Sequence, residues 1–302
     1  MRFLTRLLAT ACTSVAATAA QAVPISLGLD PSLNLVAFGN MNVGSSDVEG
    51  RVAVGGNASI NGYSINTKTG SNALYGGTGL VVGGNLTFTN GTIWGGATVG
   101  GSYSPTSSGN MMGSAPTGQG FAFATEQQRL TALSLSLDSM TNTGTAVDQW
   151  GTLHFDAAGQ MLAIFDILAG DAARNLQIDN LASGAQILIN IHGTRVDFGN
   201  HGYTGFNKGQ VLFNLPTATE VILNGGINAS LLATKASVGQ GWGQINGQVV
   251  VKDWNSSVQV NDAPMPFVPP TDTSLRKLPE PGSLALVGLG LVAAGLMRRR
   301  RF

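Results

Sequence analysis

Two groups of side chains in the sequence have the chemistry of metal ligands. His192, Asp197 and His201 fall within ten residues of one another, and Asp47 and Glu49 lie close together nearer the amino terminus. The first group matches no compact zinc-ligand spacing, and glycines separate its members, which is typical of a solvated turn. The second group lacks the dense Asp/Asn/Gly loop with a closing glutamate that calcium sites use. We therefore expect no metal site and no cofactor.

Four aspartates could supply the carboxylate pair of a glycoside hydrolase: Asp156, Asp166, Asp171 and Asp179. Such an enzyme needs two carboxyl groups on either side of the scissile bond. Nothing in the sequence shows that any two of these aspartates face each other, and aspartate is common in turns at strand ends. We predict that the protein is not an enzyme, and a polysaccharide-active enzyme on a β-helix is an alternative.

Two short threonine motifs, Thr67-Lys68-Thr69 and Thr87-Phe88-Thr89, suggest a different kind of binding surface. Ice-binding solenoids present arrays of threonine on a flat strand face, where alternate residues point to the same side. Two copies do not make an array, and threonine is also a good strand former. Ice binding is therefore a second alternative, and it rests on an analogy of fold alone.

A repeated element between residues 47 and 103 must position these side chains. Apolar or β-branched residues followed by two glycines recur there, which suits a short strand that ends in a tight backbone turn. One such unit cannot bury its apolar face, whereas stacked copies bury a continuous one. We predict that the pairs are corners of successive turns of a β-solenoid, with a β-sandwich as the competing fold. The pairs are Gly55-Gly56, Gly83-Gly84, Gly95-Gly96 and Gly100-Gly101.

A helix and further strands complete the predicted body. The helix is expected over residues 125–140, with Thr125 as its cap and with four apolar side chains on one face: Leu130, Leu133, Leu137 and Met140. It can lie along the side of the solenoid and shield one face. The other strands are expected at residues 33–40, 161–168, 186–192, 210–215, 220–223 and 247–251. The predicted fold class is mainly β, a β-helix (solenoid) with one α-helix packed alongside.

The composition of the 302 residues fits this class and limits the partners. Charged residues make up 11% of the chain and glycines number 42, which suits tight turns and extended backbone better than a helical bundle. Residues 23–278 hold 10 Lys+Arg and 15 Asp+Glu, a net charge of −5. An acidic body without a basic patch argues against nucleic acid as a partner. The single cysteine, Cys12, lies in the apparent leader, so we expect no disulfide.

The first 22 residues have the pattern of a secretory signal peptide. Arg2 and Arg6 precede an apolar stretch, and Ala20 and Ala22 are the small residues expected at a cleavage site. We predict that signal peptidase removes residues 1–22 after Ala22, with a buried amino-terminal helix as the alternative. The leader predicts export of the chain.

The carboxy-terminal segment has the pattern of a membrane anchor. Residues 268–278 form a proline-rich linker, residues 283–297 are apolar, and a basic cluster follows: Arg298, Arg299, Arg300 and Arg301. A helix over the apolar run spans about 22 Å against a hydrocarbon core of about 30 Å, so the expected transmembrane helix is marginal in length. The arginines would stop transfer and stay in the cytoplasm.

This tail, residues 279–302, resembles the PEP-CTERM sorting signal of Gram-negative bacteria, in which a Pro-Glu-Pro motif precedes a transmembrane helix and a terminal basic cluster. Pro279, Glu280 and Pro281 match the motif residue by residue. The resemblance implies recognition by exosortase, an integral-membrane enzyme, while the chain is transiently anchored in the inner membrane. The implied destination is the cell surface or the extracellular matrix.

The body, residues 23–267, resembles the choice-of-anchor A domain, an adhesin-like module found with various surface-attachment signals. Thr234 is one departure, because a proline is expected there after Leu232-Ala233. The resemblance implies surface adhesion or matrix structure, and it names no catalytic residues. It rests on residues 46–57, 80–85, 187–193, 213–219 and 245–249.

These observations together predict an exported cell-surface or extracellular-matrix protein that acts by adhesion or as a structural component, as in a biofilm. The expected partners are signal peptidase and exosortase during export and the membrane through the carboxy-terminal helix. Extracellular polysaccharide is a candidate ligand. The sequence assigns no binding residues.

Overall fold

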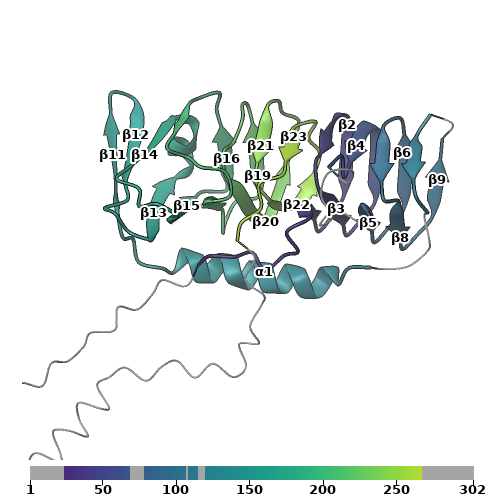
Figure 1. Cartoon of the computed structure of the whole chain (residues 1–302), viewed down its shortest axis with the longest axis horizontal. Helices are drawn as coiled ribbons and strands as arrows, with labels where there is room; N and C mark the ends of the chain where they lie inside the picture. The colour runs from purple at the N-terminus through teal and green to yellow at the C-terminus, as the bar shows by residue number, and fades with distance from the viewer. Residues whose placement is uncertain (1–23, 69–77, 107, 115–119, 267–302) are drawn as a thin grey trace, which may run out of the picture. The chain divides into compact units, whose positions relative to one another are not determined.

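The computed structural model describes residues 24–68, 78–106, 108–114 and 120–266, all within one unit, Met1–Phe267 (Figure 1). The predicted signal peptide, the linker, the sorting motif and the membrane helix lie outside the described residues, as does the whole second unit, Val268–Phe302. In the described part of the chain, no helix combines the length and the apolar character that a membrane span requires.

The described residues form 23 strands, the α-helix α1 (Phe123–Asp138) and the 3-10 helix η2 (Ala169–Ala173). The strands of the amino-terminal half are β1 (Leu33–Ala37), β2 (Met41–Val48), β3 (Arg51–Val54), β4 (Ala58–Ile65), β5 (Leu80–Val82), β6 (Leu86–Thr89), β7 (Thr92–Trp94), β8 (Ala97–Val99), β9 (Tyr103–Pro105) and β10 (Asn110–Met112). Those of the other half are β11 (Thr145–Gln149), β12 (Thr152–Asp156), β13 (Leu162–Leu168), β14 (Asn175–Asp179), β15 (Gln186–His192), β16 (Arg195–Phe198), β17 (Tyr203–Thr204), β18 (Val211–Asn214), β19 (Glu220–Leu223), β20 (Ser230–Val238), β21 (Gln244–Asn246), β22 (Val249–Trp254) and β23 (Gln259–Asn261).

The strands stack as a coil with three faces, which we name A, B and C. Face A runs in the spatial order β8, β5, β3, β1, β22, β20, β18, β15, β13, and every neighbour pair is parallel. Face B includes β9, β6, β4 and β2, and face C includes β10, β7, β23 and β21. Parallel pairing between successive turns confirms the predicted β-solenoid, because the sheets of a β-sandwich are antiparallel.

The chain enters this coil in its middle. β1 pairs with β3 on one side and with β22 on the other, so Val36 lies opposite both Ala53 and Val250. From β1 the chain coils outwards to β10, α1 carries it to the opposite end, and the later strands coil back until β22 and β23 meet β1 and β2 (Figure 1). The first and last strands of the domain are therefore neighbours, and we call this junction the seam.

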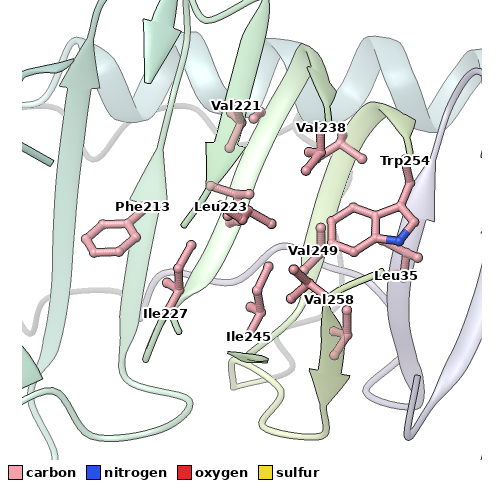
Figure 2. Packing of buried hydrophobic residues seen from close by; sticks show 14 of the residues in the cluster. Leu35, Phe213, Val221, Leu223, Ile227, Val238, Ile245, Val249, Trp254 and Val258 are labelled. Carbon is pink, nitrogen blue, oxygen red and sulfur yellow. The ribbon is translucent and has the colours of Figure 1, made fainter. Parts of the chain in front are cut away.

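The interior of the coil is a continuous apolar core. Alternate residues of each strand point inward, and one inward column on face A is at most 1% exposed: Leu80, Val52, Leu35, Val249 and Leu231. Figure 2 shows side chains from several strands, including Leu35, Val249 and Trp254, meeting inside the coil. Stacking thus buries a core that runs across the seam.

A second apolar cluster lies on the outer side of face A, beneath α1. Val36, Val250 and Leu232 point outward from face A and are buried with Leu130 and Leu137 of the helix. The amino-terminal segment adds three buried side chains to the same cluster: Ile25, Leu27 and Leu29. The helix therefore lies along one side of the solenoid and covers an apolar face, as predicted (Figure 1).

The start of α1 differs from the prediction. The helix begins at Phe123 with Ala122 as its N-cap and no side-chain capping bond, so Thr125 lies within the first turn instead of capping it. The Phe123 ring lies beside the glycine corners, 3.2 Å from where a Cβ on Gly55 would stand. Packing of Phe123 over these corners, rather than a hydroxyl cap, sets the helix start.

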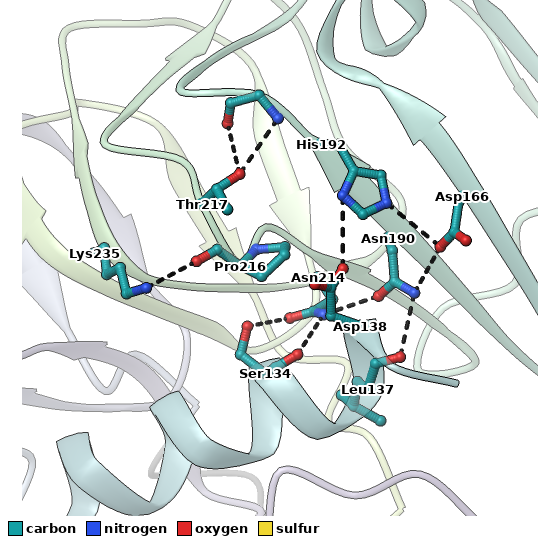
Figure 3. A network of polar contacts seen from close by, with 11 residues as sticks. Ser134, Leu137, Asp138, Asp166, Asn190, His192, Asn214, Pro216, Thr217 and Lys235 are labelled. Carbon is teal, nitrogen blue, oxygen red and sulfur yellow. Dashed lines mark hydrogen bonds and ion pairs between the residues drawn. The ribbon is translucent and has the colours of Figure 1, made fainter. Parts of the chain in front are cut away.

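A ladder of carboxamides connects α1 to face A (Figure 3). Asn190 donates to Asp166 Oδ1 (2.9 Å), and Asn214 donates to Asn190 Oδ1 (2.8 Å). Ser134 Oγ of α1 donates to Asn214 Oδ1 (2.6 Å), and Asn214 donates back to the Ser134 carbonyl (2.9 Å). Ser134, Asn190 and Asn214 are buried. The ladder satisfies their polar groups inside an apolar interface and fixes the helix in register.

Candidate binding face

Three of the four glycine pairs stack at the corner between faces A and B: Gly55-Gly56, Gly83-Gly84 and Gly100-Gly101. The Gly84 N–H donates to the Gly56 carbonyl (2.9 Å), and the Gly101 N–H donates to the Gly84 carbonyl (2.9 Å). A Cβ on Gly84 would stand 2.7 Å from the Gly56 carbonyl oxygen, so a side chain here would force the rungs apart.

The fourth pair corrects the prediction. Gly95-Gly96 lies between β7 and β8, at the corner between faces C and A, so the four pairs do not form one column. Gly100 lies five positions after Gly95. That interval is one side of the coil rather than a full turn, so the repeated phrase marks two different corners.

An asparagine ladder follows the stacked glycines onto face B. The Oδ1 of Asn40 accepts the backbone N–H of Asn57, Asn57 accepts that of Asn85, and Asn85 accepts that of Ser102, each at 2.9 Å. A Cβ on Gly56 would stand 2.5 Å from the Asn40 Oδ1, so glycine makes room for the carboxamide of the rung before. The orientation of these side chains is therefore fixed by the backbone.

A second row of polar residues runs beside the ladder. Asn42 lies opposite Ser59, Ser59 opposite Thr87, and Thr87 opposite Ser104. We call the two rows together the carboxamide strip, and all eight side chains are exposed: Asn40, Asn42, Asn57, Ser59, Asn85, Thr87, Ser102 and Ser104. The six strip residues other than Ser102 and Ser104 line a shallow groove of about 420 Å³ on face B.

The carboxamide strip is uncharged and rich in donors. At the seam the ladder continues to Asp253 of β22, whose Oδ1 accepts the Asn40 N–H (2.8 Å) and whose Oδ2 accepts from Ser237 Oγ (2.7 Å). Within the described chain, the Nδ2 groups of Asn40, Asn57 and Asn85 make no hydrogen bond. Each is a hydrogen-bond donor at the surface, while its oxygen is held by the neighbouring rung.

His192, Asp197 and His201, the residues with the chemistry of metal ligands, do not come together. His201 Nε2 contacts the Ala172 carbonyl (2.8 Å) and Asp197 accepts from Asn224 (2.9 Å). His192 lies 3.6 Å from both Asp138 and Asp166, beside the ladder that holds α1 (Figure 3). Among the described residues no group of three or more His, Cys, Asp or Glu has the arrangement of a metal site.

Asp47 and Glu49 have other partners. Glu49 pairs with Lys68 (2.8 Å) and accepts the Asp262 backbone N–H (2.6 Å). Burial raises the pKa of Asp47, and its carboxylate accepts from Thr67 Oγ1 (3.2 Å). A calcium site would gather both carboxylates around one ion, whereas here each is engaged by a different neighbour.

Two of the four candidate glycosidase carboxylates lie opposite each other, Asp156 on β12 and Asp179 on β14. A hydrogen bond from Asn180 (2.9 Å) is the main cause that lowers the pKa of Asp156, and one from Gln177 (2.7 Å) is the main cause that lowers the pKa of Asp179. Glycosidases need one carboxyl group with a raised pKa that still carries its proton. The pair lacks such an acid. The other two bind elsewhere, Asp166 to Asn190 and Asp171 to Arg174.

The threonine motifs do not form an array in the described residues. Thr87 is the single threonine of the carboxamide strip, and Thr67 lies past the end of β4, away from it. Thr69 lies outside the described residues. The regular surface of this coil is thus built mainly from asparagine and serine.

The carboxamide strip was not predicted from the sequence, although a signal for it exists. Asn57 and Asn85 directly follow their glycine pairs, and Ser102 follows the third. A second polar residue follows two positions later in each case, which places both on the outer side of a strand. The pattern Gly-Gly-polar-apolar-polar is therefore what the repeat encodes on face B.

Comparison with protein families gives two matches. Residues 31–262, more than half of the chain, match the family described as "Putative Ice-binding-like adhesive domain". Residues 278–301 match the "PEP-CTERM protein-sorting motif". The first match supports an adhesive class for the body without singling out the choice-of-anchor A family, and the second implies processing by exosortase.

Two solved structures are similar to this chain. The ice-binding protein from the Antarctic ascomycete Antarctomyces psychrotrophicus is 12% identical, covers 82% of this chain and 100% of its own, and has a TM-score of 0.31. The ice-binding protein LeIBP from an Arctic yeast is 10% identical, covers 82% and 97%, and has a TM-score of 0.32. No curated protein matches significantly.

Proposed function

The chain belongs to the family of ice-binding-like adhesive domains and carries a PEP-CTERM sorting motif, and from this premise we propose that it is an exported surface adhesin whose contact surface is the carboxamide strip. The observation that carries the proposal is the strip itself. Eight exposed, uncharged polar side chains repeat on consecutive rungs of a rigid coil. Affinity would come from many weak polar contacts, multiplied when many copies are displayed on one surface.

The route to the surface is part of the proposal. Signal peptidase would remove residues 1–22 after Ala22, and the helix over residues 283–297 would hold the chain in the inner membrane with Arg298 to Arg301 as its stop. Exosortase would then recognise Pro279, Glu280 and Pro281 and release the protein to the surface or matrix of a Gram-negative cell. Within the adhesive class, the stretches that resemble choice-of-anchor A support a relation of the body to that module.

Deletion of residues 279–302 tests the sorting step. We expect the truncated chain to leave the cell surface and appear in the periplasm or the medium, because the sorting motif and the membrane helix are both removed. Surface immunofluorescence and cell fractionation measure this. A truncated chain that stays attached to the surface as firmly as the full chain would show that the tail does not sort the protein.

A second test concerns how the protein acts. We propose that the protein acts by binding and has no catalytic activity, since the facing pair among the four candidate carboxylates, Asp156 and Asp179, has a lowered pKa at both positions. Incubation with soluble polysaccharides, followed by an assay for reducing ends, should show no cleavage. Cleavage that is lost in Asp156→Asn would establish the enzyme alternative instead.

Ice binding is the second candidate function, and the regular spacing of the carboxamide strip favours it. Its rungs repeat at about 4.8 Å on one face of a rigid coil. The strip offers one threonine methyl group, at Thr87, among amides and serine hydroxyls. Ice binding predicts measurable thermal hysteresis for the purified protein, and freezing and melting points that coincide would remove it.

A further inference from the structure

From the contacts of the carboxamide strip, and resting on the adhesive function proposed above, we infer that it binds an uncharged, hydroxyl-rich polysaccharide chain laid across the rungs. Successive rungs are about 4.8 Å apart, so the four rungs of the strip extend over about 14 Å. A pyranose unit in an extended glycan advances by a distance similar to one rung. Successive sugars can therefore meet a pair of uncharged polar side chains on each successive rung.

The hydrogen-bonding groups of the carboxamide strip complement sugar hydroxyls. The ladder uses the oxygen of each asparagine, so Asn40, Asn57 and Asn85 offer their Nδ2 groups as donors. The hydroxyls of Ser59 and Thr87 in the second row make no hydrogen bond within the described chain and can donate or accept. A sugar hydroxyl also donates and accepts, so the rungs of Asn57 with Ser59 and of Asn85 with Thr87 can each satisfy one hydroxyl from two sides.

The carboxamide strip has no charged side chain, which disfavours the binding of ionic polymers. None of its eight residues is charged. Asp253, which continues the ladder across the seam, has both carboxylate oxygens engaged by Asn40 and Ser237. An anionic polysaccharide would find no cation in the strip, and a polycation would find no row of free carboxylates. Binding should therefore depend little on salt.

The carboxamide strip is organised before any ligand arrives. The backbone N–H of Asn85 holds Asn57 Oδ1 at 2.9 Å, and Gly84 packs directly against that carboxamide. Fixing these side chains in the free protein lowers the entropy that binding would otherwise cost. A shallow groove with individually weak contacts still gives low affinity for a single site, which suits a ligand that repeats and a protein displayed in many copies.

Asparagine-to-aspartate changes separate the ladder from the ligand. In Asn57→Asp combined with Asn85→Asp, the retained oxygen can still accept the next backbone N–H, as Asp253 does for Asn40, but the Nδ2 donors are lost. Thr87→Arg is a second variant, which fills the groove without touching the ladder. The matched control is Asn175→Asp: Asn175 is exposed on β14 and its Oδ1 accepts the Gly202 N–H at 2.9 Å, far along the coil from the strip.

The assay is native affinity electrophoresis of the full chain in mild detergent, through gels that contain dextran, hydroxyethyl cellulose or polygalacturonate. We expect a neutral polymer to retard the parent and N175D equally, and to retain N57D/N85D and T87R at least about tenfold more weakly. Retention should persist at about 0.5 M salt. The inference fails if neither neutral polymer retards the parent, if both strip variants bind like the parent, or if polygalacturonate binds better and releases in salt.

The adhesive function and the glycan inference can fail separately. If cells that display the chain attach to surfaces but the protein binds neither neutral polymer, the glycan ligand is refuted and the adhesive function is not. Thermal hysteresis without retardation in the gels would also refute the glycan ligand, and it would support ice binding instead. Loss of both attachment and gel retardation in N57D/N85D, with N175D unaffected in both assays, supports the two together.

Discussion

Gly84→Ala is the sharpest test of the glycine corners. The new Cβ would stand 2.5 Å from Asn57 Oδ1, 2.7 Å from the Gly56 carbonyl oxygen and 2.9 Å from the Gly56 carbonyl carbon. The carboxamide could rotate away, but the Gly56 backbone is held in the coil by the rungs on both sides. The change must therefore increase the separation of two rungs, unlike most substitutions of a surface glycine.

The cost follows from the contacts that this separation breaks. The Gly84 N–H to Gly56 carbonyl bond and the Asn85 N–H to Asn57 Oδ1 bond, both 2.9 Å, would lengthen together. Two hydrogen bonds contribute about 1–3 kcal/mol, and overpacking adds about 1–3 kcal/mol. We expect Gly84→Ala to lower the free energy of unfolding by about 2–6 kcal/mol. The strip should also lose order at Asn57.

Urea unfolding followed by tryptophan fluorescence measures the change, because Trp254 is fully buried in the core. Gly239→Ala is the matched control: a Cβ there would meet nothing within 4 Å, so its effect should stay within about 0.5 kcal/mol. If Gly84→Ala unfolds at the same urea concentration as Gly239→Ala and the parent, the rungs do not depend on the stacked glycines and the reasoning is wrong.

Two further predictions concern stability. Asn214→Leu should lower the free energy of unfolding, measured in urea, by about 2–4 kcal/mol. The change removes the amide that donates to Asn190 Oδ1 and breaks the link to α1. A decrease below about 0.5 kcal/mol would show that the ladder does not hold the helix. Burial raises the pKa of Tyr63, whose hydroxyl donates to the Val258 carbonyl (2.8 Å). In the unfolded chain the Tyr63 hydroxyl ionises above the ordinary tyrosine pKa of about 10, whereas in the folded chain it stays protonated. The stability that this difference provides is fully present below about pH 10 and is lost as the pH rises further. The fall in urea midpoint between about pH 8 and about pH 11 should be shallower in Tyr63→Phe, and an unchanged fall would contradict this assignment.

The architecture of the body was accessible from sequence because its signals are local and repetitive. The strands predicted at residues 186–192 and 220–223 coincide with β15 and β19, and the predicted helix overlaps α1 over most of its length. In each case periodicity reports a buried face directly. The predicted start of α1 was wrong because Phe123 packs on glycines that are distant in the sequence, and a local capping rule does not include such contacts.

The carboxamide strip was harder to predict than the coil. Asn57 and Ser59 lie on one rung and Asn85 and Thr87 on the next, but their alignment depends on a register that loops of unequal length conceal. The same inequality made Gly95-Gly96 resemble the other pairs although it marks another corner. The path of the chain could not be inferred at all, because pairing of β1 with β22 joins residues more than two hundred positions apart.

The seam has a consequence for the order in which the domain can be completed. A ribosome delivers β1 early and β22 and β23 last, yet these strands lie side by side. Until residues 249–261 have been synthesised, the edge of β1 that pairs with β22 has no partner, so the amino-terminal half of the coil has an open strand edge. The strands at both extremities of the solenoid are synthesised before the residues that close its centre, so the hydrogen bonds across the seam can form only once the newest residues reach the oldest.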